Sequence, residues 1–494
     1  MLSVDDQGPF PPCPAPFNLA TYVLWANGAN DDEVAMAVLR ADGSENWSYG
    51  RLRKSVLRTA GGLVKAGLKP GDRLLLQLGN TPSFPVVFLA AVAAGILPVP
   101  TAEGLTAREF ARLRDVIRPA AIVGDGNNET LEPEALARAD PIVAPVEGDP
   151  DRPAYIVFTS GTSGRALGVV HAHRAIWARR AMHRGWYDLR RSDRLLHAGA
   201  FNWTYTLGTG LFDPWSVGAT ALVVVEDTDP SPFPQLMKQH EATLFAAAPG
   251  VFRRLLRSEI PALPKLRHAF SAGEKLPRTL RSRWREKTGT EIYEAFGQSE
   301  CSTFVSSAPG HPAPGSAIGY AQPGRRIAVL GEDGPVPRGE AGEIAINADD
   351  PGVMLGYFEA PNTTATRHRD GWFLTGDTGQ MATDGAITYL GRRDDILTAG
   401  GYRISPLEIE NAMMQHPDIE DAAAVDEKIN TETTVVALHY VSDRPLDAQS
   451  LALHAAEHLA RYKQPRAFHH HRTLPRGRGG KLLRARLRAA TEKP

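Results

Sequence analysis

The pattern of apolar and polar positions divides the chain into short hydrophobic runs separated by helical stretches. Short apolar runs bounded by glycine, proline or charged residues are typical of buried strands. The pattern predicts helices over Val86–Ala94 and Ala107–Leu113, and strands over Arg73–Leu78, Leu97–Val99, Ala120–Val123, Thr220–Val225, Leu244–Ala247, Ala269–Ser271 and Glu291–Ala295. Strands that alternate with helices indicate an α/β fold with largely parallel sheets.

The pattern changes from Gly324 onward, where turns and strands such as Gly342–Ile346 indicate a β-rich subdomain. The last hundred or so residues mix short strands and helices, which suits a small α+β domain. The charged, glycine-flanked segment Gly391–Asp395 is the expected hinge. We therefore expect a large N-terminal domain over residues 1–391, a hinge over 392–395 and a small C-terminal domain over 396–494. The proline-rich residues Met1 to Phe17 are expected to wrap the surface.

Composition narrows the class of protein. The 494 residues are 43% hydrophobic and 22% charged, with a formal net charge of −1, so overall charge favours neither nucleic acid nor an anionic membrane as partner. Only Cys13 and Cys301 are present, which favours a reducing compartment. The N-terminus lacks the basic and apolar regions of a signal peptide, and the apolar run Phe84–Pro100 is interrupted by proline and glycine. We expect a cytoplasmic protein that is not embedded in a membrane.

The segment Tyr155–Gly164 combines a predicted strand with a loop rich in small residues. Glycine permits backbone conformations closed to other residues and lets a ligand approach the main chain. Exposed amides and hydroxyl groups on a short loop suit a polyphosphate, although a polar surface turn has the same composition. The loop is not a Walker P-loop, because no Gly-Lys-Ser/Thr closes it. The candidate phosphate-binding residues are Thr159, Ser160, Gly161, Thr162, Ser163 and Gly164.

Two other predicted strands end in small or polar residues: Ser271-Ala272-Gly273-Glu274 and Ala295-Phe296-Gly297-Gln298-Ser299-Glu300. Ligands of α/β sheets bind at the carboxyl ends of the strands. The three segments are therefore expected to meet at one cleft, with ordinary strand–helix turns as the alternative. The C-terminal stretch from Arg461 to Arg488 contains ten Lys or Arg and no Asp or Glu. Such a stretch either binds an anion or forms a solvated face that balances acidic residues elsewhere.

With these motifs in order, the chain from about Leu68 to Leu487 resembles the acyl- and aryl-CoA synthetases of the adenylate-forming superfamily. The resemblance implies ATP-dependent, AMP-forming ligation of a small-to-medium aliphatic or aromatic carboxylic acid to coenzyme A through an acyl-adenylate. It implies Mg²⁺ as cofactor, ATP and coenzyme A as co-substrates, and a monomer or homodimer. It also implies that the small C-terminal domain is mobile.

The resemblance assigns roles to individual residues. It implies that Lys481, Glu300 and Thr159 are catalytic and that Glu300 and Thr159 hold the metal. Asp377 and Arg392 match the residues that contact the ribose, and Phe296 matches the aromatic ring that stacks on adenine. Besides the loop residues, the implied nucleotide-binding set comprises Gly273, Glu274, Phe296, Gly297, Ser299, Asp377 and Arg392.

The remaining roles concern the second half-reaction and the acid. Asp394 matches the hinge, and Gly400, Gly401, Tyr402 and Arg403 match the coenzyme A channel. The acyl pocket is expected at Asn202, Trp203, Ser271 and Gly297, where an inward Trp203 would shorten the pocket. One position departs from the family, because Ala166-Leu167 stands where Pro-Lys usually precedes the glycine that closes the phosphate loop.

Three other functions remain open at this point. The first is an adenylating enzyme that passes the acyl group to a carrier protein instead of free coenzyme A, and the second is a non-catalytic nucleotide-binding relative. A nucleic-acid binder with a basic tail is the third, and the balanced net charge argues against it. His171 and His173 flank the loop and are read as structural, because adenylation of a carboxylate needs no general base.

Overall fold

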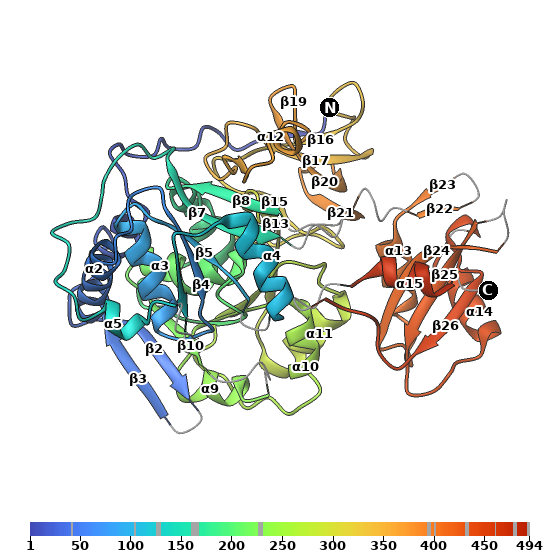
Figure 1. Cartoon of the computed structure of the whole chain (residues 1–494). Helices are drawn as coiled ribbons and strands as arrows, with labels where there is room; N and C mark the ends of the chain where they lie inside the picture. Colours follow the sequence, from blue (N-terminus) through green and yellow to red (C-terminus); the bar gives the residue numbers. More distant parts are fainter. Residues whose placement is uncertain are drawn as a thin grey trace.

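The computed structural model shows a large α/β body and a smaller domain at the C-terminal end (Figure 1). Within the described part of the chain, no helix is both long and apolar enough to cross a membrane. The structure describes residues 1–494 except 41–42, 103–104, 125–129, 160–166, 226–230, 393–396, 400–401, 430–433, 460, 478–481 and 492–494.

A nine-stranded sheet forms the centre of the large body. Its middle strands β13, β12, β11, β9, β10 and β2 are parallel, whereas β15, β14 and β3 at the two ends run antiparallel to their neighbours. This confirms the expected α/β fold. The strands in spatial order are β15 (Tyr320–Ala321), β14 (Ser302–Ser306), β13 (Ile292–Gln298), β12 (His268–Ser271), β11 (Leu244–Ala247), β9 (Arg194–Ala198), β10 (Thr220–Val224), β2 (Val34–Arg40) and β3 (Gly43–Ser48).

Both faces of this sheet are covered, which explains why its inner strands are continuous apolar runs. On one face, helices α9 (Phe233–Gln239), α10 (Pro249–Leu255) and α11 (Arg278–Thr288) enclose a core built around Phe245, Phe252 and Trp284. On the other face, Trp186 and Tyr187 pack against Phe270.

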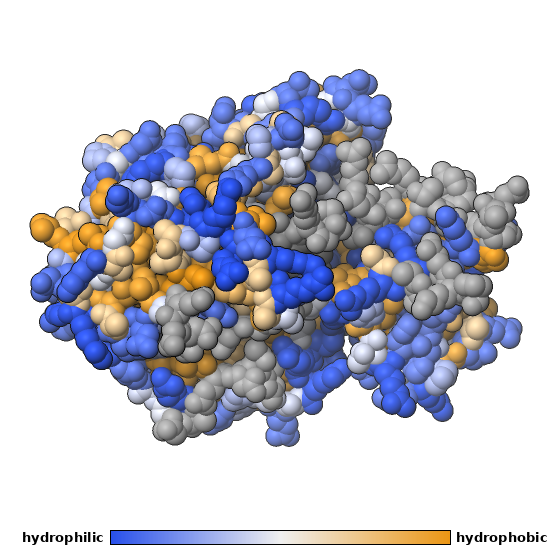
Figure 2. Space-filling model, in the orientation of Figure 1, coloured by the Kyte–Doolittle hydropathy of each residue, from blue (hydrophilic) through white to orange (hydrophobic). Residues whose placement is uncertain are grey.

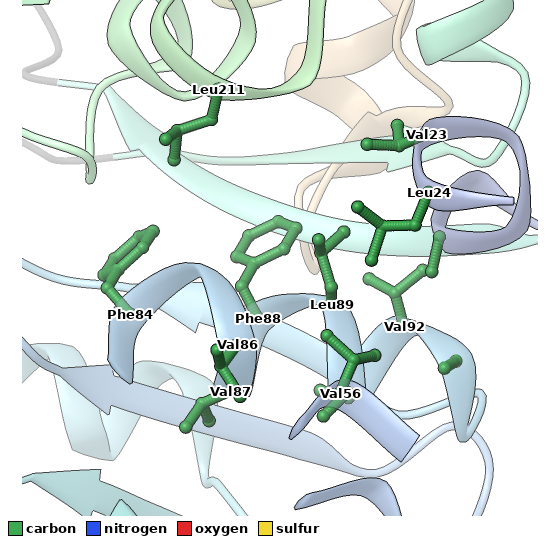
Figure 3. Close-up of a cluster of buried hydrophobic side chains, with 14 of the residues drawn as sticks. Val23, Leu24, Val56, Phe84, Val86, Val87, Phe88, Leu89, Val92 and Leu211 are labelled. Carbon is green, nitrogen blue, oxygen red and sulfur yellow. The ribbon is translucent and has the colours of Figure 1, made fainter. Parts of the chain in front are cut away.

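A second layer is organised around helix α3 (Ser83–Ala93). Its residues Phe84 through Ala93 are all buried, because α1 (Leu19–Leu24), α2 (Tyr49–Lys65) and the helical turn Thr206–Phe212 surround it. Figure 3 shows Phe84 and Phe88 pointing towards Leu211. The parallel sheet β5-β4-β6 (Leu97–Pro100, Arg73–Gln77, Ala121–Gly124) belongs to this layer. Next to it, β7 (Pro153–Thr159) and β8 (Leu167–Ala172) form an antiparallel hairpin, and β18 (Gly356–Tyr357) pairs with β8.

The β-rich subdomain is a six-stranded antiparallel sheet. The N-terminal segment lies at the surface as expected, since most of residues 1–17 are exposed or half-buried, and its residues Val4–Asp6 also pair with β16 as an edge strand. Its sequence is too short and too polar to show a strand pattern. The strands are β1 (Val4–Asp6), β16 (Arg326–Leu330), β17 (Ala341–Asn347), β20 (Trp372–Met381), β19 (His368–Arg369) and β21 (Ile387–Arg392).

In its described residues, the C-terminal domain contains the hairpin β22–β23, the three-stranded sheet β24-β25-β26 and three α-helices. Its own apolar core confirms the expected α+β unit. Most of its visible surface that is not grey is hydrophilic (Figure 2). The exact boundary at residues 392–395 stays a prediction. The elements are β22 (Leu397–Ala399), β23 (Tyr402–Ile404), α13 (Pro406–Met413), β24 (Asp421–Lys428), β25 (Thr434–Val441), α14 (Ala448–His458), β26 (Ala467–His471) and α15 (Arg484–Thr491).

Candidate active site

The carboxyl ends of β9, β11, β12 and β13 lie at one edge of the large sheet, because these strands are parallel neighbours. Gly273, two residues after β12, has a φ of +93°, a conformation that favours glycine. A Cβ atom at Gly273 would lie 3.7 Å from the indole ring of Trp203, which follows β9. The structure therefore brings together two of the residues that the sequence placed at the nucleotide and the acid.

Strand β13 extends further than expected, through Gln298, so that Phe296 and Gly297 belong to the strand and not to the loop after it. A bulge between these two residues marks the irregular pairing with β14. A Cβ atom at Gly297 would lie 2.0 Å from the carbonyl oxygen of Ser302, so only glycine fits there. The Phe296 ring lies 5.4 Å from the Tyr389 ring and 5.3 Å from the Phe304 ring, which fixes its orientation.

Asp377 lies in the interior of β20 with 3% of its surface exposed. The Tyr389 hydroxyl donates to its Oδ1 at 3.0 Å, and Nε2 of Gln298 donates to its Oδ2. Arg392 Nε is 3.9 Å from Oδ1, and the pairing of β20 with β21 sets Asp377 opposite Arg392. Burial is the main cause that raises the pKa of Tyr389 well above its ordinary value, and the Asp377 carboxylate adds to it, so the phenol stays a donor. The two expected ribose contacts are thus neighbours.

Gln298 links this carboxylate to the end of β13. Its Nε2 also lies 2.6 Å from the carbonyl oxygen of Thr375, and its Oε1 accepts from Arg367 at 3.1 Å. No role was predicted for Gln298, Arg367 or Tyr389. Gln298 lies inside the segment Ala295–Glu300, which was the available signal, whereas nothing in the local sequence marks the other two as partners of this site.

Glu300 is held by contacts from the segment around β18. Its Oε1 accepts from the Tyr357 hydroxyl at 2.8 Å, and its backbone oxygen accepts from Met354 N at 2.7 Å. Since β18 pairs with β8, this segment connects Glu300 to the hairpin whose first strand ends at Thr159. A carboxylate and a hydroxyl are hard oxygen donors, which is the ligand chemistry that Mg²⁺ prefers.

Several predicted residues fall outside the described part of the chain. These are Ser160, Gly161, Thr162, Ser163, Gly164, Asp394, Gly400, Gly401 and Lys481. Tyr402 and Arg403 are described only as backbone in β23. The roles of all these residues stay predictions.

Two of the predicted acyl-pocket residues, Asn202 and Trp203, lie in the turn that follows β9. The ring of Trp203 is 6.5 Å from that of Tyr205, and the neighbouring Thr204 hydroxyl lies 3.4 Å from the hydroxyl of Ser299. Asn202 is partly exposed in the same turn. Ser271 is fully buried and, by strand alternation, shares a face with Ala269 on the side of helices α10 and α11.

His197 was missed by the sequence analysis. It is 7% exposed, and neither ring nitrogen has a hydrogen-bond partner among the described residues. Its ring meets Tyr205 edge to face at 4.4 Å. Burial lowers its pKa to about 3, so the imidazole is neutral. A lone histidine at the end of an apolar strand carries no sequence signal that separates a site residue from a core residue.

The other two histidines support their structural reading. His171 is buried, and its ring stacks on that of Tyr155 at 4.7 Å. His173 Nδ1 accepts from Leu19 N at 3.0 Å, which caps the start of α1. Burial lowers the pKa of His171 to about 4 and that of His173 to about 3, so both rings are neutral at pH 7.

Glu274 connects the candidate site to the C-terminal domain. Its Oε2 lies 3.4 Å from Nη1 of Arg476, and Nη2 of Arg476 lies 2.8 Å from Oδ2 of Asp421. Arg253 of α10 approaches the same Asp421 at 3.6 Å. Charges of alternating sign therefore cross between the two domains: Glu274, Arg476, Asp421 and Arg253. A bridge between Arg476 and Leu482 brings together the two ends of the segment that contains Lys481.

Comparison with known proteins identifies relatives over almost the whole chain. The model of a family described as AMP-binding enzyme matches residues 24–358, and the AMP-binding enzyme C-terminal domain matches residues 408–481. The chain is 28% identical to the mitochondrial acyl-coenzyme A synthetase ACSM3 of Rattus norvegicus, over 96% of this chain and 90% of that protein. It is 30% identical to a 4-hydroxybenzoate–CoA/benzoate–CoA ligase of Rhodopseudomonas palustris, over 91% and 90%. A solved benzoate CoA ligase from Burkholderia xenovorans LB400 matches with a TM-score of 0.87 at 26% identity, covering 96% of this chain and 100% of that one.

Proposed function

This chain belongs to the AMP-binding enzyme family, and its relatives include an acyl-coenzyme A synthetase and a 4-hydroxybenzoate–CoA/benzoate–CoA ligase, so we propose that it joins a small-to-medium aliphatic or aromatic carboxylic acid to coenzyme A through an acyl-adenylate. ATP supplies the AMP group, and pyrophosphate and AMP leave in turn. The observation that carries the proposal is the arrangement at the edge of the large sheet. Gln298, the last residue of β13, contacts Asp377, which lies beside Arg392. The same strand carries the Phe296 ring, and Glu300 follows its end by two residues.

In the first step the carboxylate of the acid attacks the α-phosphorus of ATP, and the bond to pyrophosphate breaks. The barrier comes from crowding of negative charge and from alignment, so fixed donors and cations lower it most. In the proposed arrangement Phe296 contacts the adenine, and Asp377 accepts from the ribose hydroxyls. Mg²⁺ held by Glu300 and Thr159 would neutralise phosphate charge when bound. Lys481 would supply a cation beside the α-phosphate.

In the second step the thiol of coenzyme A attacks the acyl carbon, and AMP leaves. We assign this step to a second orientation of the C-terminal domain, reached by rotation at Asp394, with Gly400 to Arg403 beside the pantetheine arm. We assign the orientation in the structure to the first step, and the contact of Arg476 with Glu274, together with the bridge between Arg476 and Leu482, supports this assignment. A domain rotation lets one cleft serve two reactions.

The acid is proposed to be small or aromatic. The contact of the Trp203 ring with Gly273 supports a position of this side chain in the wall of the acyl pocket. Tyr205 adds a second ring to this wall. A wall of flat rings favours a planar or short acid over a long alkyl chain.

A panel of carboxylic acids, assayed for pyrophosphate release and thioester formation with and without coenzyme A, tests the proposal. We expect Mg²⁺-dependent pyrophosphate release with benzoate-sized or short aliphatic acids, and AMP as the second product. Release of ADP and orthophosphate would refute the reaction class. Adenylate formation without transfer to free coenzyme A would instead indicate a carrier protein as acceptor, and no turnover of any acid would indicate a non-catalytic relative.

Lys481→Ala tests the division of labour between the two steps. Adenylation should fall by about 10²–10³-fold, the usual effect of removing one group that stabilises developing charge. Thioester formation from supplied acyl-adenylate should be nearly unchanged. Arg478→Ala, which removes a nearby cation from the same segment, is the matched control and should change neither rate substantially. Equal loss of both steps in folded Lys481→Ala would refute the role assigned to this lysine.

A further inference from the structure

Helix α14, on the C-terminal domain, presents three metal-ligating side chains on one face. His454, Glu457 and His458 are at positions i, i+3 and i+4, and this spacing places side chains of a helix side by side. One ligand atom from each lies within 4.8 Å of the others. His454 is partly buried, whereas Glu457 and His458 are exposed to solvent. Neither the nucleotide site nor the proposed transfer step uses these residues.

Backbone hydrogen bonds set the tautomers of the two imidazoles. His454 Nε2 lies 3.1 Å from the carbonyl oxygen of Ala412 in α13, and His458 Nδ1 lies 2.8 Å from the carbonyl oxygen of His454. A carbonyl oxygen only accepts, so each of these nitrogens carries the proton and donates. The lone pair then remains on Nδ1 of His454 and on Nε2 of His458. Metal-binding histidines typically donate their other N–H to a carbonyl in this way, which fixes the ring and makes it a better ligand.

The two rings are also arranged as a pair. Their centroids are 4.3 Å apart, with 30° between the ring planes, so both imidazoles lie over the same turn of the helix. The sequence of the turn, His-Ala-Ala-Glu-His, has the His-x-x-Glu-His spacing that occurs in a class of zinc-binding helices. The hydrogen bonds that fix the two tautomers are an observation independent of this spacing.

We propose that His454, Glu457 and His458 bind a divalent transition-metal ion of the zinc class. Two imidazole nitrogens and one carboxylate oxygen are a ligand set that Zn²⁺ accepts, with water in the remaining position. Mg²⁺ prefers oxygen ligands alone, so this ion would differ from the one expected at Glu300. Because His454 also holds α14 to α13 through Ala412, a bound metal would stabilise the packing of the two helices.

A second group of histidines on β25 and β26 is the natural competitor for metal. His439 Nδ1 and His471 Nε2 are hydrogen-bonded to each other at 2.8 Å, and His469 Nε2 is paired with Glu427 at 2.7 Å. These nitrogens already have partners, and burial lowers the pKa of His439 to about 3. Among the described residues, the α14 group is the one whose three ligand atoms all lie within 4.8 Å of one another, and the second group does not have this arrangement.

Equilibrium dialysis of the full-length, untagged protein against ZnCl₂ after removal of metal by a chelator tests the proposal. We expect a zinc ion bound per chain. His458→Ala and the double variant His454→Ala/His458→Ala should weaken binding by more than the roughly 10- to 100-fold that loss of an outer-shell partner costs. The matched controls are His469→Ala, from the competing group, and His416→Ala, whose ring lies 5.2 Å from that of His454. Both controls should keep full zinc binding.

Thermal unfolding gives a second measurement that does not depend on activity. Zinc should raise the Tm of the wild-type protein and of both controls, but not that of the double variant. Absence of zinc binding, unchanged binding in the folded double variant, or loss of binding in His469→Ala would each overturn the proposal. Since His458 is exposed, its replacement leaves the fold intact even if the change at His454 does not.

Discussion

Arg476 gives the sharpest test of how the two domains cooperate. Its guanidinium contacts Glu274 of the large domain at 3.4 Å and Asp421 of its own domain at 2.8 Å. Burial works against the charge, but the carboxylates of Asp421 and Glu274 raise the pKa of Arg476 above its ordinary value. The change Arg476→Gln removes the charge and keeps a polar side chain. We expect it to weaken the domain orientation that is proposed above for adenylation.

The size of the effect expected for Arg476→Gln depends on how exposed the Arg476–Glu274 pair is. The Arg476 and Glu274 side chains are 24% and 20% exposed, so the pair lies between a surface salt bridge and a buried one. A surface pair contributes about 0–1 kcal/mol, and breaking a buried pair costs about 3–5 kcal/mol. A value of about 1–2 kcal/mol for this contact corresponds to a factor of about 5–30 in a two-state population. The adenylation rate should therefore fall by up to that factor.

The assay compares the two half-reactions separately. Pyrophosphate release should fall in Arg476→Gln, whereas thioester formation from supplied acyl-adenylate should change little. Arg257→Gln is the matched control, because Arg257 pairs with Glu420 across the same interface at 3.2 Å but both side chains are largely exposed. In a Glu274→Gln background the effect of Arg476→Gln should shrink, since the partner is already lost. Equal effects of Arg476→Gln and Arg257→Gln, or equal loss of both half-reactions in folded protein, would refute the reasoning.

Three further predictions concern single positions. Leu167→Lys should lower the apparent KM for ATP by restoring the cation that the family usually has; an unchanged or raised KM, relative to Leu167→Met, would mean that the loop works without it. Trp203→Ala should shift kcat/KM ratios towards bulkier acids, and unchanged ratios would identify Trp203 as packing only. Burial lowers the pKa of His173 from 6.5 to about 3, so stability should fall as the pH drops below 6.5, where the unfolded chain takes up the proton first. His173→Asn retains an acceptor for Leu19 N and should reduce this loss of unfolding free energy by up to about 1.4 kcal/mol per pH unit. The same dependence of the unfolding free energy on pH in urea unfolding curves of the variant would contradict the prediction.

The hydrophobic pattern predicted the elements whose burial comes from their own sequence. The expected strand Leu244–Ala247 coincides with β11, since a strand buried on both faces is apolar throughout. The edge strands lacked this signal. β3 (Gly43–Ser48) is polar and mostly exposed, and β1 (Val4–Asp6) has only three residues. Both are strands because of their neighbours, so pairing across the fold decided what local pattern did not.

In the candidate site, too, some residues were predicted from the sequence and others were not. The sequence motifs indicated Glu300 and Asp377, but not the side chains that orient them. Tyr357 is 57 residues from Glu300, and Gln298 is 79 residues from Asp377. Such contacts depend on the packing of the β18 segment and of β20 against the end of β13. A single sequence contains the residues but not their distances, so the contacts of Tyr357 and Gln298 with these carboxylates could be identified only from the structure.

The basic stretch from Arg461 to Arg488 shows how far a local charge count can mislead. Arg484 is paired with Glu410, 74 residues away, through two contacts of 2.6 and 2.8 Å, and Arg488 is paired with Asp426 at 2.6 Å. Arg476 is paired with Asp421 at 2.8 Å. Each of these three cations meets a carboxylate of the same domain that lies far away in sequence. A cation whose charge is already paired releases little free energy on contact with a phosphate backbone, because the existing pair must first be broken. Among the described residues, Arg476, Arg484 and Arg488 are therefore accounted for by ion pairs within the C-terminal domain and by the contact of Arg476 with Glu274.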